Sequence, residues 1–284
     1  MRGMTFYKYQ GAGNDFLIAD NRDGLAVLSS ADISAICDRR YGVGADGVML
    51  LEQSQNASFM MKYYNSDGSG GMMCGNGGRC IAAFAVDSGV VDGCGCFEFE
   101  AADGMHAAAV LSDEGRSKVV RLKMKDVCCV ARHDSLCGLA GDTGGYFLDT
   151  GTRHFVQFMD DVSAYDVVGR GRMIRFNAAE FQPVGTNVNF VGMADEVLQV
   201  RTYEKGVEDE TFACGTGIVA SCICAYLHGI PANELPDGSV GYDVRALRDR
   251  LSVGFVPHGS DVESFSASDV WLTGPAAYVA EIRF

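Results

Sequence analysis

Short segments in which apolar and polar residues alternate recur along the chain and predict a protein built mainly from β-strands. A half-buried strand has an apolar residue at every second position, as Leu251, Val253 and Phe255 do. Further strands are expected at Thr5–Tyr9, Leu17–Ala19, Val48–Leu51, Ser58–Tyr64, Phe97–Glu100, Val119–Met124, Phe155–Phe158, Val188–Val191 and Val197–Tyr203. The pattern therefore indicates sheets, with helices in the minority.

Three helices are predicted among these strands. Ser30–Arg40 starts with a serine cap signal and carries Asp32 in its first turn, as helix N-termini often do. Gly75–Val86 and Gly215–Leu227 are apolar on nearly all faces, and the latter ends at His228-Gly229. A helix that is apolar all round is buried on all sides, so these two helices are expected to lie inside the protein.

Two parts of the chain resemble each other, which indicates an internal duplication. Cys74-Gly75-Asn76-Gly77 matches Cys214-Gly215-Thr216-Gly217, and the leading cysteines are 140 positions apart (214 − 74). Three further matches precede these motifs in the same order: Gly13-Asn14-Asp15-Phe16 with Gly151-Thr152-Arg153-His154-Phe155, Val43-Gly44-Ala45-Asp46 with Val184-Gly185-Thr186-Asn187, and Lys62-Tyr63-Tyr64-Asn65 with Arg201-Thr202-Tyr203-Glu204. We therefore predict two similar, mostly-β units, formed by residues 1–119 with 269–284 and by residues 120–268.

The composition limits the classes of partner. The 284 residues are 48% hydrophobic, which is typical of a globular protein. A net charge of −14 repels phosphate backbones and anionic lipids, so neither nucleic acid nor a membrane surface is an expected partner. No apolar run is long enough to span a membrane, and Met1–Phe6 lacks the apolar core of a signal peptide. We therefore expect a cytoplasmic protein.

One motif suggests nucleotide binding, but its context argues against that function. Gly42–Gly47 matches the G-x-G-x-x-G fingerprint, yet it follows a predicted helix and precedes the predicted strand Val48–Leu51. A dinucleotide-binding loop has the reverse order, strand first and helix second. The sequence also contains neither a Walker A loop nor the G-x-S-x-G elbow of many hydrolases. Nucleotide binding and serine-hydrolase chemistry therefore lose support.

The eleven cysteines are odd in number and too sparse for a disulfide scaffold in a chain of this length. The pairs Cys94-Gly95-Cys96 and Cys128-Cys129 have no second pair or histidine at the spacing of a zinc site, so no metal is expected. Nine cysteines are expected to be small buried hydrophobes: Cys37, Cys80, Cys94, Cys96, Cys128, Cys129, Cys137, Cys222 and Cys224.

Cys74 and Cys214 differ from the rest because each stands where a loop enters an apolar helix and is followed by Gly-x-Gly. Unbonded N–H groups at a helix start favour negative charge, so this position promotes the thiolate and can bind a carboxylate. We expect the two cysteines to face each other across an interdomain cleft. Such a thiolate and thiol suit the removal of a proton from one face of a carbon and its delivery to the other.

These motifs resemble those of the diaminopimelate epimerases. The resemblance runs from about residue 4 to Thr273-Gly274-Pro275 and rests on six segments in the family's order: Gly11–Phe16, Gly42–Gly47, Asn65–Gly68, Cys74–Gly77, Gly185–Asn187 and Ala213–Gly217. It implies an epimerase without a cofactor that interconverts LL- and meso-diaminopimelate, in lysine and peptidoglycan precursor synthesis. The implied fold is α/β (α+β), with two pseudo-symmetric halves, each a barrel-like mixed sheet around a central helix, and a last strand that returns to the first half.

The resemblance also implies roles for individual residues. Cys74 and Cys214 correspond to the two acid–base residues, whereas His154 and Glu204 correspond to polar groups near the reacting amino group. The positions that correspond to substrate contacts are Asn14, Asn65, Gly75, Asn76, Asn187, Lys205, Gly215 and Thr216. Of these, the four residues at the helix starts are expected to bind the reacting carboxylate through their N–H groups.

Simpler interpretations of four polar residues stay open. Asn14 and Asn65 are common turn-forming side chains. Glu204 could equally be a solvated charge, and His154 an ordinary packed histidine. The sequence does not choose between these interpretations and the functional ones.

Three departures from the family pattern fall on the part that holds the far end of the substrate. Lys205 stands where the family has arginine, and lysine lacks the planar fork that grips a carboxylate. Thr152-Arg153 replaces an Asn-Pro pair, and the segment 206–211 is one residue longer than usual. The type of reaction is therefore better supported than the substrate.

Three alternative functions stay open. A racemase of another amino acid would fit the same fold and would explain Thr152 and Lys205. A thiol-based redox protein would use Cys74 and Cys214 as a reversible pair, although they form no Cys-x-x-Cys motif. A non-catalytic amino-acid-binding protein would have no need of both cysteines. In the epimerase and racemase interpretations the partner is a small amino-acid substrate, and a homodimer is an open option for the assembly.

Overall fold

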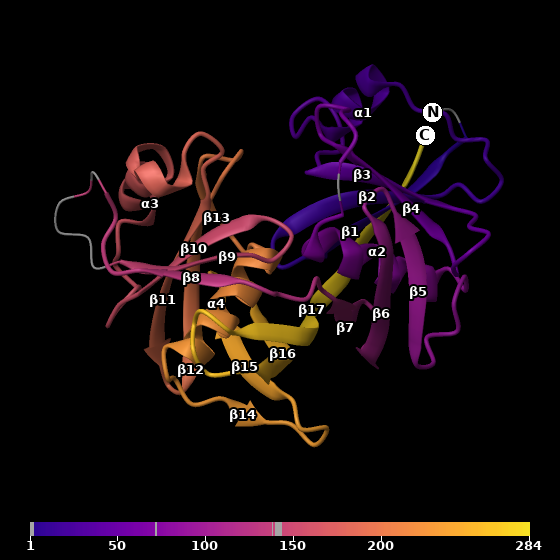
Figure 1. Cartoon of the computed structure of the whole chain (residues 1–284). Coiled ribbons are helices and arrows are strands. Elements are labelled where there is room, and N and C mark those ends of the chain that lie inside the picture. The colour runs from indigo at the N-terminus through magenta and orange to yellow at the C-terminus, as the bar shows by residue number, and fades with distance from the viewer. Residues whose placement is uncertain (1–2, 72, 138, 140–143) are drawn as a thin grey trace. The chain divides into compact units, whose positions relative to one another are not determined.

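The structure is a computed structural model, and it describes residues 3–71, 73–137, 139 and 144–284. These residues form two compact units: unit 1 contains Met1–Lys123 and Thr273–Phe284, and unit 2 contains Met124–Leu272 (Figure 1). Each boundary lies four residues beyond the one predicted from the repeat (123 − 119 and 272 − 268). Met1 and Arg2, which begin the segment expected to lack signal-peptide character, lie outside the described residues.

Unit 1 contains a closed ring of strands. They are β1 (Thr5–Gly11), β2 (Asn14–Asp20), β3 (Gly47–Glu52), β4 (Met60–Asn65), β5 (Cys96–Ala101), β6 (Gly104–Asp113), β7 (Ser117–Lys123) and the C-terminal part of β17 (Ser266–Arg283). Each strand from β1 to β7 pairs with the next one along the chain, and β17 pairs with both β7 and β1. The β2–β3 and β4–β5 pairs are parallel, so the sheet is mixed. The ring closes because the last strand returns to unit 1, as predicted.

The helix α2 (Gly75–Asp87) is the buried helix of unit 1. It contacts β1, β2, β3, β6 and β7, and every residue from Gly75 to Ala85 is buried. A helix surrounded by strands needs apolar or small side chains on all faces. Glycine in the first turn meets this need, because a Cβ on Gly78 would lie 2.9 Å from the Leu122 side chain. The prediction that this helix is buried on nearly all sides is confirmed.

The helix α1 (Ser30–Cys37) packs against β3 and begins with a capping box. The Ser29 hydroxyl accepts the Asp32 N–H, and the Asp32 carboxylate accepts the Ser29 N–H. The helix ends three residues earlier than predicted (40 − 37). It ends there because the Asp38 carboxylate accepts the N–H groups at positions 40 and 41 and turns the chain.

The described residues of unit 2 form nine further strands and two α-helices. The strands are β8 (Val130–His133), β9 (Gly145–Asp149), β10 (Arg153–Phe158), β11 (Asn187–Ala194), β12 (Val197–Glu204), β13 (Asp209–Thr211), β14 (Asn233–Glu234), β15 (Val240–Arg245) and β16 (Arg250–His258). The helices are α3 (Val167–Asn177) and α4 (Gly215–Leu227), with a short 3-10 helix at Ala179–Phe181. α4 contacts β9, β10, β11, β12, β15 and β16, and it is buried from Gly217 to Ala225. Within the described part of the chain, no helix is long and apolar enough to cross a membrane.

The two units have the same order of elements, which confirms the two similar halves and the α+β class predicted from the sequence. β9, β10, α3, β11, β12, α4, β15 and β16 correspond to β1, β2, α1, β3, β4, α2, β5 and β6. The strand directions repeat as well: β10–β11 and β12–β15 are parallel, like β2–β3 and β4–β5. β13 and β14 are short additions to unit 2.

The helix α3 is not predicted from the hydrophobic pattern. It contains two glycines and three arginines in eleven residues, so its apolar periodicity is weak. Its start is set instead by Asp166, whose carboxylate accepts the Gly169 N–H at 2.9 Å. Packing against β12 stabilises the remainder of the helix, because the Gly171 backbone lies directly on the Tyr203 side chain. Tertiary contact thus outweighs local propensity here.

The predicted burial of the cysteines is correct for four positions and wrong for five. Cys37, Cys80, Cys222 and Cys224 are buried, as expected. The exposed ones are Cys94, Cys96, Cys128, Cys129 and Cys137. These five lie in connecting segments or at a strand end, where the backbone runs along the surface.

We expect Gly171→Ala to destabilise the protein, although alanine normally favours a helix over glycine. The added Cβ would lie 2.3 Å from Tyr203 Cβ, an atom fixed to the β12 backbone, so α3 must move. The free energy of unfolding in urea should fall by about 2 kcal/mol.

Gly169→Ala is the matched control in the same helix. Its Cβ would displace the Asp166 carboxylate that caps the helix, so the loss should be that of one cap, about 1 kcal/mol, and smaller than that of Gly171→Ala. A Gly171→Ala variant as stable as the unmodified protein would contradict the packing described for α3.

Candidate active site

Cys74 is the N-cap residue of α2, with an extended backbone (φ −112°, ψ 152°) and an exposed side chain. The first helical bond runs from the Gly78 N–H to the Cys74 carbonyl at 2.8 Å. The Gly77 N–H donates to the Cys74 sulfur, with an N–Sγ distance of 3.3 Å. The N–H groups of a first helical turn have no acceptor within the helix, and they form its positive end. This position therefore favours the thiolate and can hold an anionic group.

Asn76 and Asn14 are joined side chain to side chain beside Cys74. The Asn76 amide donates to Asn14 Oδ1 at 2.5 Å, and the Arg79 guanidinium donates to Asn76 Oδ1 at 2.9 Å. Arg79 is completely buried and also donates to the carbonyls of Gly75, at 3.1 Å, and Pro275, at 3.3 Å. A planar guanidinium fixes several acceptors at once. Arg79 therefore holds Asn76 in a defined orientation at the start of α2.

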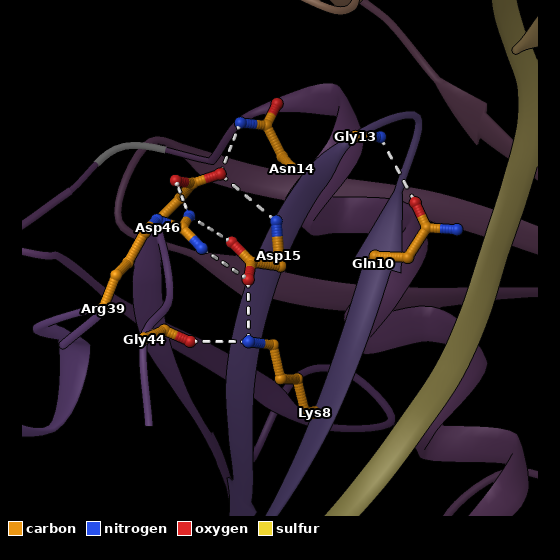
Figure 2. Close-up of polar contacts among 8 residues, drawn as sticks. All are labelled: Lys8, Gln10, Gly13, Asn14, Asp15, Arg39, Gly44 and Asp46. Atoms are coloured by element: carbon orange, nitrogen blue, oxygen red, sulfur yellow. Dashed lines mark hydrogen bonds and ion pairs between the residues drawn. The ribbon is translucent and has the colours of Figure 1, made fainter. Parts of the chain in front are cut away.

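An ionic cluster holds Asn14 from its other side (Figure 2). The Asn14 amide donates to Asp46 at 2.9 Å, and Asp46 accepts the Arg39 guanidinium at 2.7 Å. Arg39 and Lys8 both bind Asp15, at 2.6 and 2.8 Å. Burial raises the pKa of Asp15, but the bonds from Arg39 and Lys8 outweigh it and lower the pKa below its ordinary value. Asp15 therefore stays charged, and the cluster fixes the Asn14 side chain.

Asn65 ends β4 and pairs with Gly47 of β3. Its amide donates to the Ser69 hydroxyl at 3.0 Å, and its backbone N–H donates to the Ser69 carbonyl at 2.9 Å. The next residue, Ser66, donates its N–H to the Asp46 carbonyl at 3.1 Å, and Asp46 holds Asn14. The structure thus links Asn65 to the other predicted residues of unit 1, and it also gives Asn65 a turn-forming role.

Cys214 occupies the corresponding place in unit 2, as the N-cap residue of α4 (φ −103°, ψ 108°). The Ile218 N–H donates to its carbonyl at 2.9 Å, so α4 begins as α2 does. Two features differ. Cys214 is only 8% exposed, and its sulfur lies 3.4 Å from the Thr216 hydroxyl oxygen. The two halves therefore repeat the backbone position of the thiol but surround it with different polar groups.

His154 lies behind Thr216 and is completely buried. Its Nε2 is 2.9 Å from the hydroxyl oxygens of both Thr216 and Thr152, and its Nδ1 is 3.1 Å from the Asn189 amide nitrogen. Burial lowers the pKa of His154 to about 3, although the Asp149 carboxylate acts in the opposite direction. The imidazole is therefore neutral near pH 7 and takes part through hydrogen bonds instead of charge.

Asn187 connects the remaining predicted residues of unit 2. Its amide donates to the Arg153 carbonyl at 2.9 Å, and its Oδ1 accepts the Lys205 N–H at 2.8 Å. Glu204, next to Lys205, is half-buried and accepts the Thr211 hydroxyl at 2.8 Å. Burial raises the pKa of Glu204, and the Thr211 bond partly opposes this. Asn187 thus joins Lys205 to the start of β10, and Glu204 is not a fully solvated charge.

The three residues that depart from the family pattern have distinct positions. Thr152 contacts His154 and Thr216 through its hydroxyl, which lies 3.1 Å from Thr216 Oγ1. The Arg153 side chain is exposed. Lys205 is also exposed, and its ammonium group donates to the Val184 carbonyl at 3.3 Å. Thr152 is therefore part of the polar network around Cys214, whereas the two cations lie at the surface of unit 2.

Asn189, Thr202 and Arg79 belong to these networks but were missed by sequence reasoning. Asn189 is completely buried and accepts the Thr202 hydroxyl at 2.9 Å. A Cβ on Gly217 would lie 2.3 Å from Asn189 Oδ1, so α4 can pack here only with glycine at that place. The available signal was a polar residue inside an apolar run, as in Val188-Asn189-Phe190 or in the helix that holds Arg79.

Each unit therefore offers a thiol at a helix start, adjacent hydrogen-bond donors for an anion, and buried polar residues that fix their orientation. Such a set can exchange a proton with a carbon next to a carboxylate. Among the described residues, no group of three or more His, Cys, Asp or Glu side chains is arranged to hold a metal ion.

Comparison with solved structures identifies the fold. The chain is similar to a phenazine biosynthesis protein of the PhzF family from Bacillus anthracis, with a TM-score of 0.71, 14% identity and coverage of 99% of both chains. It is also similar to a hydroxyproline epimerase from Agrobacterium vitis, with a TM-score of 0.68, 15% identity and coverage of 99% of this chain and 91% of the other. At these identities the likeness concerns the fold.

Comparison with sequences is more specific. The family model described as diaminopimelate epimerase matches residues 6–127 and 146–239. The chain is 39% identical to a diaminopimelate epimerase from Flavobacterium psychrophilum over 282 residues, covering 98% of this chain and 99% of the relative. It is 40% identical to one from Chlorobaculum tepidum over 271 residues, covering 95% and 96%. The chain therefore belongs to the diaminopimelate epimerase family.

Proposed function

We propose that this protein interconverts LL- and meso-diaminopimelate, with Cys74 and Cys214 as the two acid–base groups. The observation that carries the proposal is the repeated placement of a cysteine at the N-cap of a buried helix, once in each unit. Family membership and relatives named diaminopimelate epimerase support the reaction and the substrate. With this function, the protein acts in the cytoplasm, in the synthesis of lysine and of peptidoglycan precursors.

The proposed step is a proton exchange at the substrate α-carbon. One cysteine, as thiolate, takes the α-proton, and the other, as thiol, gives its proton to the opposite face. The number of protons on the two sulfurs is unchanged, but the thiolate and thiol have exchanged places. After one turnover the enzyme therefore has the protonation state needed for the reverse reaction. This is consistent with an enzyme that works in both directions.

The helix starts supply stabilisation for the charge that develops. When the α-proton leaves, electron density moves onto the reacting carboxylate. Backbone N–H groups at Gly75, Asn76, Gly215 and Thr216 are the proposed partners of that carboxylate, because first-turn N–H groups favour negative charge. Arg79 and Asn189 then act as residues that fix these first turns.

A racemase of another amino acid is the second candidate function. It is favoured by Lys205 and Thr152, at positions that the resemblance assigns to the distal end of diaminopimelate. Lys205 is exposed, and lysine lacks the planar fork for a fixed, bidentate grip on a carboxylate. The proton exchange would be the same, so substrate assays separate the two candidates.

The first test follows the α-proton by proton NMR in deuterated water, with reduced protein and LL-diaminopimelate. We expect the α-proton signal to disappear and the meso isomer to form. Cys74→Ala and Cys214→Ala should each slow epimerisation by about a hundredfold or more, because each removes one of the two proton-transfer groups.

Cys129→Ala is the control for general effects of losing a thiol, since Cys129 is exposed and outside the proposed site. It should keep the full rate. Full turnover in either Cys74→Ala or Cys214→Ala would rule out the two-thiol mechanism. Untouched diaminopimelate, with α-proton exchange in another L-amino acid, would support the racemase instead.

The second test uses the pH dependence of the rate. The Thr211 hydroxyl stabilises the Glu204 carboxylate, so Thr211→Val should raise the pKa of Glu204 further above its ordinary value. If the carboxylate form is the active one, the acidic limb of the pH–rate profile moves to higher pH. Thr211→Ser should restore the original profile. An acidic limb that stays in place in Thr211→Val would show that the charge of Glu204 is not required.

A further inference from the structure

The direction of the hydrogen bonds around His154 can be derived from one fixed point, the carbonyl oxygen of Phe155. A carbonyl only accepts, so the Asn189 atom 3.0 Å away must be the amide nitrogen. Asn189 Oδ1 then faces the Thr202 hydroxyl, which donates to it at 2.9 Å. The second hydrogen of the amide points to His154 Nδ1 at 3.1 Å. Nδ1 is therefore an acceptor and carries no proton.

A neutral imidazole without a proton on Nδ1 carries it on Nε2. The His154 Nε2–H therefore donates to the hydroxyl oxygens 2.9 Å away, those of Thr152 and Thr216. These hydroxyls lie 3.1 Å from each other, so Thr152 can pass its own hydrogen to Thr216 Oγ1. Each threonine oxygen then accepts a hydrogen bond. The hydroxyl hydrogen of Thr216 is not used by these bonds, and it can be donated to the Cys214 sulfur, 3.4 Å away.

We infer that Asn189 and Thr152 are positioning residues that fix a one-way hydrogen-bond chain from His154 through Thr216 to the Cys214 sulfur. The chain makes the Thr216 hydroxyl a permanent donor to Cys214 and so stabilises its thiolate. This inference rests on the proposed function, because it assigns a purpose to the thiolate of Cys214. It differs from a role for His154 as a base, since the ring neither gives up nor gains a proton.

Thr152 connects His154 to Thr216 in this hydrogen-bond network. Its hydroxyl both accepts from His154 and donates to Thr216. In unit 1 the Cys74 sulfur receives a backbone N–H from Gly77 instead. The buried Cys214 sulfur thus receives its hydrogen bond from a side-chain hydroxyl, whereas the exposed Cys74 sulfur receives one from a backbone N–H of its own helix.

The surroundings of His154 keep the ring neutral while Cys214 changes its charge. The groups that face it are Asn189 from β11, Thr216 from α4 and Thr152, which directly precedes β10. Asp149 of β9 is the charged group that acts on it, and its effect is smaller than that of burial. The tautomer should therefore stay the same across the working pH range.

The first experiment reads the tautomer directly. In the complete protein labelled with 15N-histidine, long-range 1H–15N NMR distinguishes the Nε2–H form, the Nδ1–H form and the imidazolium. His154, assigned by its absence from a His154→Gln variant, should give the Nε2–H pattern unchanged from about pH 5.5 to 8.5, across the ordinary range of histidine titration. An Nδ1–H pattern, or titration of His154 within this range, would overturn the inference.

The second experiment measures how fast iodoacetamide alkylates Cys214 at different pH values, by mass spectrometry of its peptide. Thr216→Val removes the last donor of the chain, so the alkylation profile should move to higher pH and the rate at pH 7 should fall about tenfold. Thr152→Val should cause a smaller shift in the same direction. Thr216→Ser and Thr152→Ser keep the hydroxyls and should restore the original profile.

Changes in access and in ionisation can be told apart in this experiment. A structural change that opens or closes the site alters the plateau rate at high pH, whereas loss of the donor moves the position of the profile along the pH axis. A Thr216→Val profile that superimposes on that of the unmodified protein would overturn the inference.

Neither measurement depends on turnover. Failure of the proposed function would be seen as the expected tautomer and alkylation profile without epimerisation. Failure of the hydrogen-bond chain would be seen as epimerisation with the wrong tautomer or an unmoved profile.

Discussion

The proposed chemistry of this protein depends on the N–H groups in the first turns of two buried helices, which have no acceptor within their own helix. A helix leaves its first N–H groups without internal partners, and burying them without an acceptor is costly. α2 and α4 begin at Cys74 and Cys214, so the sulfurs and an incoming anion are the groups that can complete these first turns. Strands surround the rest of each helix, which is why small and apolar residues fill both sequences. The motif Cys-Gly-x-Gly satisfies both demands, since glycine permits close packing and cysteine supplies the sulfur that we propose as the acid–base group.

The duplicated backbone supports two different polar environments. In unit 1 a buried arginine, Arg79, fixes the first turn of α2 through Asn76, and an ionic cluster holds Asn14. In unit 2 the described members of the corresponding network are neutral groups: Asn189, His154 and two threonines. We expect the exposed Cys74 thiol and the buried Cys214 thiol to respond differently to the same substrate. Duplication thus supplied two equivalent positions, and side-chain changes made them unequal.

Much of the fold and of the site follows from the sequence, because both rest on local patterns. The two buried helices have unbroken apolar faces, and the paired motifs lie at their starts, so Cys74 and Cys214 could be located without coordinates. Other features depend on contacts between distant segments. α3 exists because Gly171 fits against Tyr203, and the tautomer of His154 follows from Asn189, thirty-five positions away (189 − 154). The exposed cysteines were misjudged for the same reason, since residue type alone does not determine which connecting segment lies at the surface.

The path of β17 has a consequence for the order in which the protein can be made. Unit 2 is one continuous stretch, Met124–Leu272, but unit 1 needs Thr273–Phe284 to close its ring of strands. The N-terminal part of the chain is synthesised first. The edges of β1 and β7 that pair with β17 therefore stay unpaired until more than a hundred further residues have been made. Open strand edges are the surfaces on which nascent chains aggregate. Unit 2 can finish folding before unit 1, and Thr273–Phe284 then close the open sheet of unit 1 into a barrel.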